Sequence, residues 1–152
     1  MSKTVYAHLA DLQPLVGREI GASDWLTVEQ SRIDLFAQAT DDHQWIHVDP
    51  QRAAAGPFGA TVAHGFLTLS LLPPLFESAF EIADVRMGIN YGLNRVRFPA
   101  PVRVGSRLRG RFRLLSYESL PGGAQLVVEA TVELEGSDKP ACVAESVTRR
   151  FT

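Results

Sequence analysis

The sequence predicts an α+β fold in which one antiparallel sheet wraps around a central apolar helix. The first half of the chain carries helical spacing and helix-start signals, whereas the second half carries consecutive strand patterns. Between them, residues 61–72 are apolar on every side, so a helix there must be enclosed by the sheet. With 152 residues, of which 45% are hydrophobic and 21% charged, we expect one domain over residues 1–152.

The first helix is predicted to begin at a capping box, in which the side chains of Thr27 and Gln30 satisfy free backbone N–H groups. Helical spacing then continues through Ile33, Phe36, Ala37 and Thr40. A second, short helix is predicted from Asp49 as N-cap and Pro50 as first helical residue to residue 55, where 56–60 form a loop.

Five strands are predicted after the central helix, near residues 83–91, 93–100, 104–118, 124–135 and 141–151. Residues 120–123 form a turn, so the strands on either side of it are expected to pair as a hairpin. That hairpin places Arg113 opposite Glu129 and Arg109 opposite Glu133, as a solvated ladder of charges.

Composition excludes several classes of protein. The net charge is -2 and no nucleic-acid-binding motif is present, so we expect no nucleic-acid partner. The longest apolar run, residues 66–76, is too short to cross a bilayer and contains two prolines, so no membrane partner is expected. The N-terminus has no apolar signal core, and the single Cys142 fits a buried small residue in a reducing compartment. A cytoplasmic protein is the resulting prediction.

Asp42 and His47 are the most informative residues, because they place a carboxylate and an imidazole five residues apart where the helical pattern ends. On a continuous helix, five residues turn by about 140°, so the two side chains meet only if the chain bends between them. A carboxylate and an imidazole around one water can add water to an activated double bond or remove it.

Gly65 is predicted to complete such a site. At the first turn of a buried helix its N–H is unpaired and has no side chain in front of it, so it can stabilise a thioester oxygen that becomes an enolate. The neighbouring His64 fits a helix-start residue whose ring binds a backbone group.

The sequence suggests two other ligand sites. His43 and His47, with Asp42 or His64, could bind a metal, but the pattern lacks HExxH and no cysteine contributes, so no metal is expected. Residues 86–113 contain eight arginines and no acidic residue. Of these, Arg95 and Arg97 precede the hairpin and lack acidic partners, so they are the better candidates for binding a ligand's phosphates.

Four motifs together resemble the MaoC-like (R)-specific enoyl-CoA hydratases, and within them the nodulation-protein-N-like branch. They are TDDHQWIHVDP at 40–50, GPFG at 56–59, AHGFL at 63–67 and NYGLNRVRFPAPV at 90–102. The resemblance covers roughly residues 15–150 and implies a hot-dog fold, usually as a homodimer. It also implies reversible syn hydration of a trans-2-enoyl-CoA to the (R)-3-hydroxyacyl-CoA, with no metal or prosthetic group and with coenzyme A or acyl-carrier protein as part of the substrate.

By this resemblance Asp42 and His47 are the catalytic dyad, and the Gly65 amide binds the thioester oxygen. The remaining candidates for substrate binding are Gln44, His64, Arg95 and Arg97. A hot-dog thioesterase and a non-catalytic acyl-thioester-binding module remain alternatives at this point.

The chain departs from the family pattern at three places. Asp41 stands where a Gly usually precedes the catalytic Asp, and would favour protonation of one carboxylate if both pointed into the site. Gln44-Trp45 replaces the usual Asn-Pro, with Gln44 able to make the hydrogen bonds of the Asn. Ser70 is a candidate for a serine that some members use.

Overall fold

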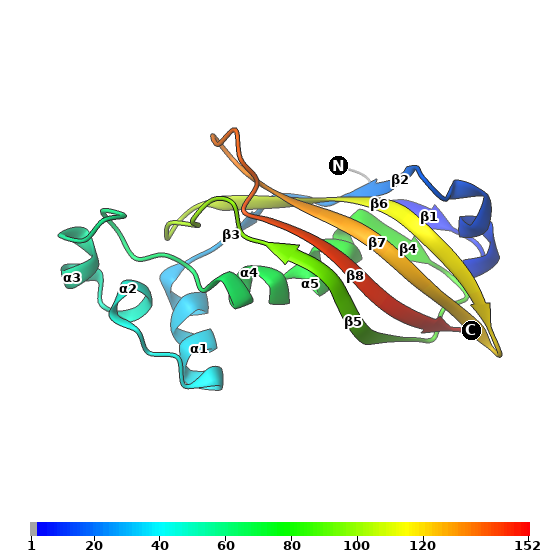
Figure 1. Ribbon diagram of the computed structural model, residues 1–152, viewed down its shortest axis with the longest axis horizontal. Coiled ribbons are helices and arrows are strands. Elements are labelled where there is room, and N and C mark those ends of the chain that lie inside the picture. Colours follow the sequence, from blue (N-terminus) through cyan, green and yellow to red (C-terminus); the bar gives the residue numbers. More distant parts are fainter. Residues whose placement is uncertain (1–2) are drawn as a thin grey trace.

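A computed structural model describes residues 3–152 of the chain (Figure 1). Its elements, in chain order, are β1 (Thr4–Tyr6), the 3-10 helix η1 (Leu9–Leu15), β2 (Glu19–Ala22), β3 (Leu26–Thr27), α1 (Gln30–Thr40), α2 (Trp45–Val48), α3 (Pro50–Ala54), α4 (Gly65–Ser70), α5 (Leu72–Ala79), β4 (Phe80–Ile82), β5 (Met87–Arg97), β6 (Arg107–Leu120), β7 (Gly123–Leu134) and β8 (Cys142–Phe151).

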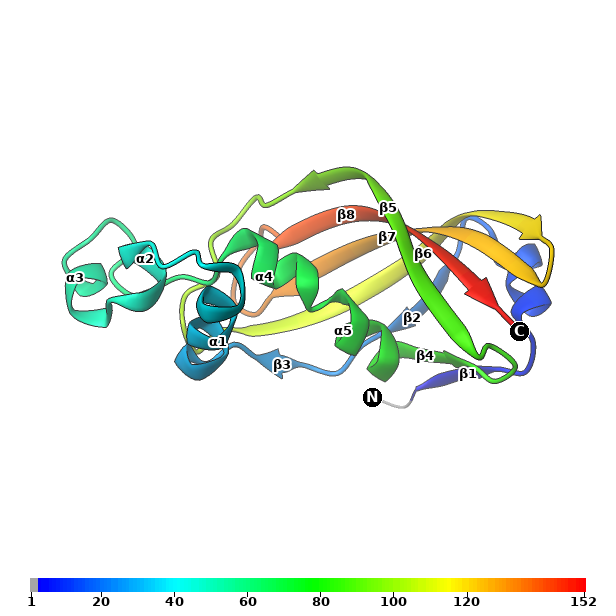
Figure 2. The same cartoon turned by 90° about the horizontal axis from the view of Figure 1, so that it is seen from below.

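The main sheet is antiparallel, with strand order β2-β6-β7-β8-β5 and β3 paired to β6. A separate pair, β1 and β4, is parallel. Helices α4 and α5 cross the inner face of the curled main sheet (Figure 2), whereas α1, α2 and α3 project beyond one end of it (Figure 1). The predicted α+β arrangement, a sheet around a central helix, is confirmed.

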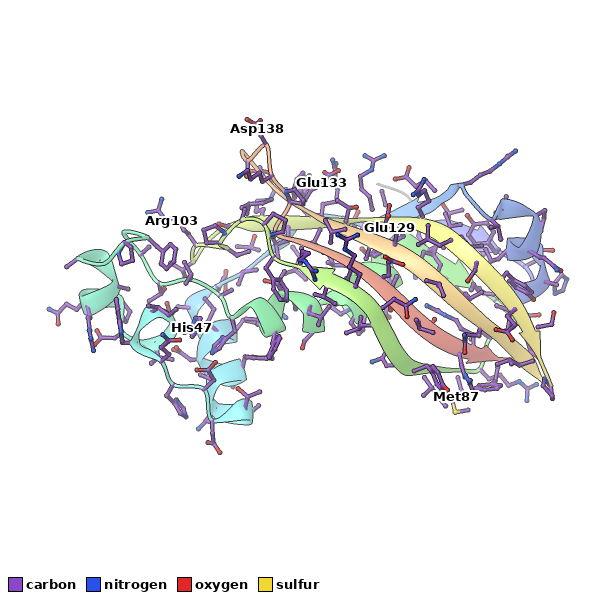
Figure 3. The ribbon with its side chains drawn as sticks, viewed as in Figure 1. His47, Met87, Arg103, Glu129, Glu133 and Asp138 are labelled. Carbon is purple, nitrogen blue, oxygen red and sulfur yellow. The ribbon has the colours of Figure 1, made fainter. Side chains whose placement is uncertain are left out.

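The predicted hairpin and its charge ladder are also confirmed. Arg113 pairs with Glu129 and Arg109 with Glu133 across β6 and β7, and Arg109 Nη2 lies 2.6 Å from a Glu133 carboxylate oxygen. Figure 3 shows Glu133 on the side of the sheet away from α4 and α5. The other face of the same strands is buried, at Leu126, Val128, Ala130 and Val132. Alternation with period two therefore separates the charged face from the core.

The core lies between this inner face and the central helix. Phe112 of β6 has no exposed surface, and its ring centroid lies 4.4 Å from that of Phe76 in α5. Within residues 3–152, no helix combines the length and apolar character needed to span a membrane. The Cys142 thiol is buried as predicted, and burial raises its pKa to about 11, so the thiol stays protonated.

The central helix differs from the prediction in where it starts and in how it is enclosed. It begins at Gly65 rather than at residue 61, breaks at Leu71, and continues as α5 with Pro73 in its first turn. Proline fits there because the first turn has no intrahelical partner for its missing N–H. Residue Val62 instead forms an isolated bridge with Arg103, and Phe66 is 71% exposed, so one side of α4 is not enclosed.

Three local predictions were wrong. Thr27 ends β3 rather than capping α1, whose N-cap is Glu29 without a side-chain hydrogen bond. Strands β1, β2 and β3 were not predicted, because each is only two to four residues long. The two strands predicted on either side of Gly92 are one strand, β5, with a bulge at that glycine. The short helix α3 is confirmed, with the Asp49 carboxylate accepting from the Arg52 N–H.

Candidate active site

A sharp reversal of the chain after α1 brings Asp42 and His47 together, as the prediction requires. Asp41 ends α1 with φ 60°, in the left-handed region that glycine adopts at least cost. This conformation accounts for the glycine that is usual at this family position. The Asp41 side chain is 97% exposed and lies 3.9 Å from His43 Nε2, so it does not crowd the Asp42 carboxylate.

His47 is buried and held in one tautomer. Its Nδ1 lies 2.6 Å from the Val62 carbonyl oxygen, which can only accept, so Nδ1–H donates and Nε2 carries the lone pair. Burial lowers the pKa of His47 most strongly, and the nearby His64 lowers it further; the Val62 hydrogen bond and the Asp42 charge oppose this without reversing it. The structure therefore presents a neutral imidazole with an available base, Nε2.

His64 stacks on His47, with ring centroids 3.8 Å apart and an interplanar angle of 21°. It is the N-cap residue of α4, and its Nε2 lies 3.0 Å from the Asp42 carbonyl oxygen, so Nε2–H donates. This is the helix-start ring bound to a backbone group that the sequence predicts. Its Nδ1 is buried and has no hydrogen-bond partner within residues 3–152, which leaves a second nitrogen lone pair at the site.

Three acceptor groups thus converge. One ligand atom from each of Asp42, His47 and His64 lies within 4.8 Å of the other two. Asp42 is exposed, so the cluster is open to solvent on one side. The same spacing suits a bound water between acceptors, or the donor set of a metal. His43 is not part of it, because its ring is 56% exposed and faces Asp41, so the alternative of a His43–His47 metal pair is wrong.

Gly65 is the first residue of α4 and follows His64 directly. No acceptor in residues 3–152 pairs with its backbone N–H. A Cβ at this position would come within 3.2 Å of the Phe98 ring, so glycine allows this ring to lie close to the helix start. Gly65 also lines a cavity of about 300 Å³ together with Ala63, Phe58 and Phe98. The cavity therefore gives a ligand access to the start of α4.

The other predicted residues lie at or beyond the edge of this cluster. Gln44 is exposed, and it acts on the dyad through its backbone: its N–H lies 3.4 Å from Asp42 Oδ1, and its carbonyl accepts from the His47 N–H. Arg95 and Arg97 are exposed on β5, and Arg97 donates to the carbonyl of Val96. No interaction within residues 3–152 joins either arginine to the dyad.

Three further residues help to position His47 and were not predicted to do so. Gln30 Nε2 donates to the His47 carbonyl at 2.8 Å, and the Thr61 hydroxyl donates to Gln30 Oε1 at 2.5 Å. The sequence indicated only a capping role for Gln30. Val62 acts through its backbone, donating to the Ile46 carbonyl and accepting from the His47 ring, and no side-chain pattern could have revealed that.

Comparisons with known proteins show the family of the chain. Residues 11–136 match the family described as "MaoC like domain". The chain is 57% identical to 3-hydroxyacyl-thioester dehydratase Z of Mycobacterium tuberculosis, over 95% of this chain and 96% of the relative. It is 54% identical to Nodulation protein N of Rhizobium leguminosarum bv. viciae, over 92% of this chain and 89% of the relative.

Among solved structures, the fold is similar to that of the (R)-hydratase from A. caviae, with a TM-score of 0.69 at 21% identity, over 88% of this chain and 94% of that one. At this identity the likeness concerns the fold alone, and it confirms the predicted hot-dog architecture.

Proposed function

The chain belongs to the MaoC like domain family, and from this premise we propose that it catalyses the reversible syn hydration of a trans-2-enoyl-CoA to the (R)-3-hydroxyacyl-CoA. The observation that carries the proposal is the cluster of Asp42, the neutral His47 and His64, in which His64 directly precedes Gly65 with its unpaired N–H. The name of the 57% identical relative, a 3-hydroxyacyl-thioester dehydratase, supports an acyl thioester as substrate. The name of the A. caviae (R)-hydratase fits the proposed stereochemistry.

The hydrogen bond from His47 Nδ1–H to Val62 supports His47 as the base. A water bound between the dyad donates one hydrogen to the Asp42 carboxylate and the other to His47 Nε2. As its oxygen bonds to C3, His47 takes this second proton, and the double-bond electrons move toward the thioester carbonyl. The Gly65 N–H stabilises the negative charge that develops on that oxygen.

The same imidazole then completes the addition. The protonated His47 Nε2 returns its proton to C2 as the carbonyl re-forms, so the hydroxyl and the hydrogen arrive on the same face. Asp42 keeps its charge throughout and stabilises the transient imidazolium. Coenzyme A enters only as part of the substrate, and no metal or prosthetic group takes part in this proposal.

The low pKa of His47 predicts the pH dependence of hydration. Only the neutral ring can take the proton, so kcat/KM should fall at acidic pH with a midpoint below the ordinary imidazole value of 6.5. The measurement is kcat/KM for crotonyl-CoA as a function of pH. A midpoint above 6.5, or a rate that rises as the pH falls, would contradict the role of His47 as base.

One assay separates this function from the two alternatives. Purified protein is incubated with crotonyl-CoA, while the enoyl absorbance and the release of free thiol are followed in parallel. Loss of absorbance without thiol release identifies a hydratase, thiol release identifies a thioesterase, and binding without turnover identifies a binding module. Hydration that survives exhaustive chelation of metal ions supports chemistry by the dyad alone. Loss of hydration when metal ions are removed would contradict a mechanism without a metal.

We expect the protein to form a homodimer through β5. This strand is the edge of the main sheet, and its large apolar side chains are 45–60% exposed: Met87, Ile89, Tyr91 and Leu93. An exposed apolar edge favours pairing with another strand. The expected mass in light scattering is twice the 16.7 kDa of the chain. A stable monomer at micromolar concentration would contradict this expectation.

Arg95 and Arg97 remain candidates for binding the phosphates of coenzyme A. Both are exposed, and no acidic residue within residues 3–152 pairs with them. Arg97 directly precedes Phe98, whose ring lies against Gly65. Phosphates bound by these arginines would place the rest of the ligand near the start of α4.

A further inference from the structure

A cavity of about 590 Å³ lies between α5, β4, β5 and β8, away from the dyad. Its apolar wall includes Phe76, Phe80, Ile82 and Ile89. Arg150, the penultimate residue of β8, brings a guanidinium group into this wall. A guanidinium group that packs against aromatic rings is partly removed from water, and an anionic partner would stabilise it.

Arg150 has no acidic partner among residues 3–152. The guanidinium carbon lies 5.7 Å from the ring centroid of Phe76 and 5.6 Å from that of Phe80. Its one hydrogen bond is a long one, from Nε to the Thr148 hydroxyl at 3.4 Å. Burial lowers the pKa of Arg150, which shows that its charge is poorly solvated. The terminal N–H groups of the Arg150 guanidinium are therefore available to an anion.

The other charges around the cavity do not neutralise Arg150. Lys3 and Glu81 pair with each other, with 3.7 Å between Lys3 Nζ and a carboxylate oxygen. Glu77 is exposed and makes no ion pair with Arg150. Arg150 is thus the positively charged group of this lining that has no ion pair among residues 3–152.

This cavity adjoins a second one, of about 370 Å³, and the two share Pro73, Phe76 and Asn90. The second cavity reaches Leu69 and Ser70 of α4, the helix that begins at Gly65. Together they form a groove along the central helix, between it and β5. Gly65 and Leu69 lie four residues apart, on one face of α4, and Leu69 lines the second cavity. A tail that follows this face from a thioester at Gly65 would enter the second cavity and point toward Arg150.

We propose that Arg150 binds a carboxylate at the far end of the acyl tail, so that ω-carboxyacyl thioesters are the preferred substrates. This inference rests on the proposed hydration and adds its substrate class. A carboxylate accepts two parallel hydrogen bonds from a guanidinium fork and neutralises the desolvated charge, which a methyl end cannot do.

The test compares trans-2-enoyl-CoA substrates in pairs of equal chain length, with and without a terminal carboxylate. Saturated analogues of the same pairs are titrated calorimetrically, because they bind without turning over. The variant Arg150→Met keeps the stem that packs on Phe76 and Phe80. Arg149→Met is the matched control, because Arg149 stacks on Tyr91 and bonds to Gln125 instead of lining the cavity.

At the chain length that spans the groove, we expect the carboxylated analogue to bind roughly 10–100-fold more tightly than its plain counterpart. Arg150→Met should abolish this preference, and Arg149→Met should retain it. Crotonyl-CoA is too short to reach Arg150 and should be hydrated equally by all three proteins.

Three results would overturn the inference. They are equal binding of the carboxylated and plain analogues by the wild type, tighter binding of the carboxylated analogue by Arg150→Met, and tight binding of free fatty acids but not of the thioesters. If crotonyl-CoA is not hydrated while the Arg150-dependent preference is seen, the carboxylate site stands and the proposed hydration fails.

Discussion

Replacing His47 with Gln is expected to lower the rate of enoyl-thioester hydration by roughly 10²–10⁴, the usual contribution of a general base. Gln can still donate to the Val62 carbonyl, so the local hydrogen bond can survive, but it cannot take a proton from water at neutral pH. Asp42→Asn should cost a comparable factor, because the neutral amide stabilises an imidazolium far less than a carboxylate does. Initial rates with crotonyl-CoA measure both effects.

The chain supplies a matched control for each change. His43→Gln and Asp41→Asn alter the same residue types beside the dyad, at side chains that are 56% and 97% exposed. Both controls should keep activity close to that of the wild type. Comparable circular dichroism spectra and melting temperatures will show that the dyad variants are folded. Near-wild-type turnover in His47→Gln, or an equal loss in His43→Gln, would remove His47 from the mechanism.

Replacing Phe112 with Ala is expected to lower the free energy of unfolding by about 3–5 kcal/mol. The ring is fully buried between the sheet and α5, and it contacts the aromatic side chains Phe76 and Phe80. Truncation leaves a cavity that the surrounding β6 and α5 cannot fill without moving. Urea denaturation followed by circular dichroism measures the change.

The control for this prediction is Leu35→Ala, at a side chain on α1 that is 66% exposed. It should change the free energy of unfolding by no more than about 0.5 kcal/mol, as surface substitutions usually do. A loss below about 1 kcal/mol for Phe112→Ala would mean that this ring does not anchor the core.

The sheet could be predicted because its signals are local. Strand β6 alternates arginine with apolar residues or glycine over residues 107–114, strand β7 alternates half-buried with buried residues over residues 123–132, and the turn at Gly122 fixes their register. Strands β2 and β3 are too short for any period to develop, and they exist because β6 offers them an edge. The start of α4 was misplaced for the same kind of reason: Val62 pairs with Arg103 across the fold, which helix propensity cannot foresee.

Less of the site than of the sheet could be predicted. Asp42, His47 and Gly65 were identified from their residue types and from the resemblance, and the left-handed Asp41 supplies the bend that they need. The stacking of His64 on His47, and the hydrogen bond from His47 to Val62, depend on two segments that meet only in the folded chain. The tautomer of His47, on which the proposed role of this residue depends, therefore required the structure.

The two stacked histidines also constrain each other. The two rings stack in one small buried volume, and His64 is one of the causes that lower the pKa of His47. This relation links the packing of the start of α4 to the chemistry of the dyad.

The stereochemistry of water addition in deuterium oxide tests this account most directly. Crotonyl-CoA is hydrated by the wild-type protein, and the product is analysed by proton NMR and by the configuration at C3. If one imidazole both takes and returns the proton, the hydroxyl and the deuterium will lie on the same face, and C3 will have the R configuration. Addition to opposite faces, an S product, or unreacted thioester at high protein concentration would contradict it.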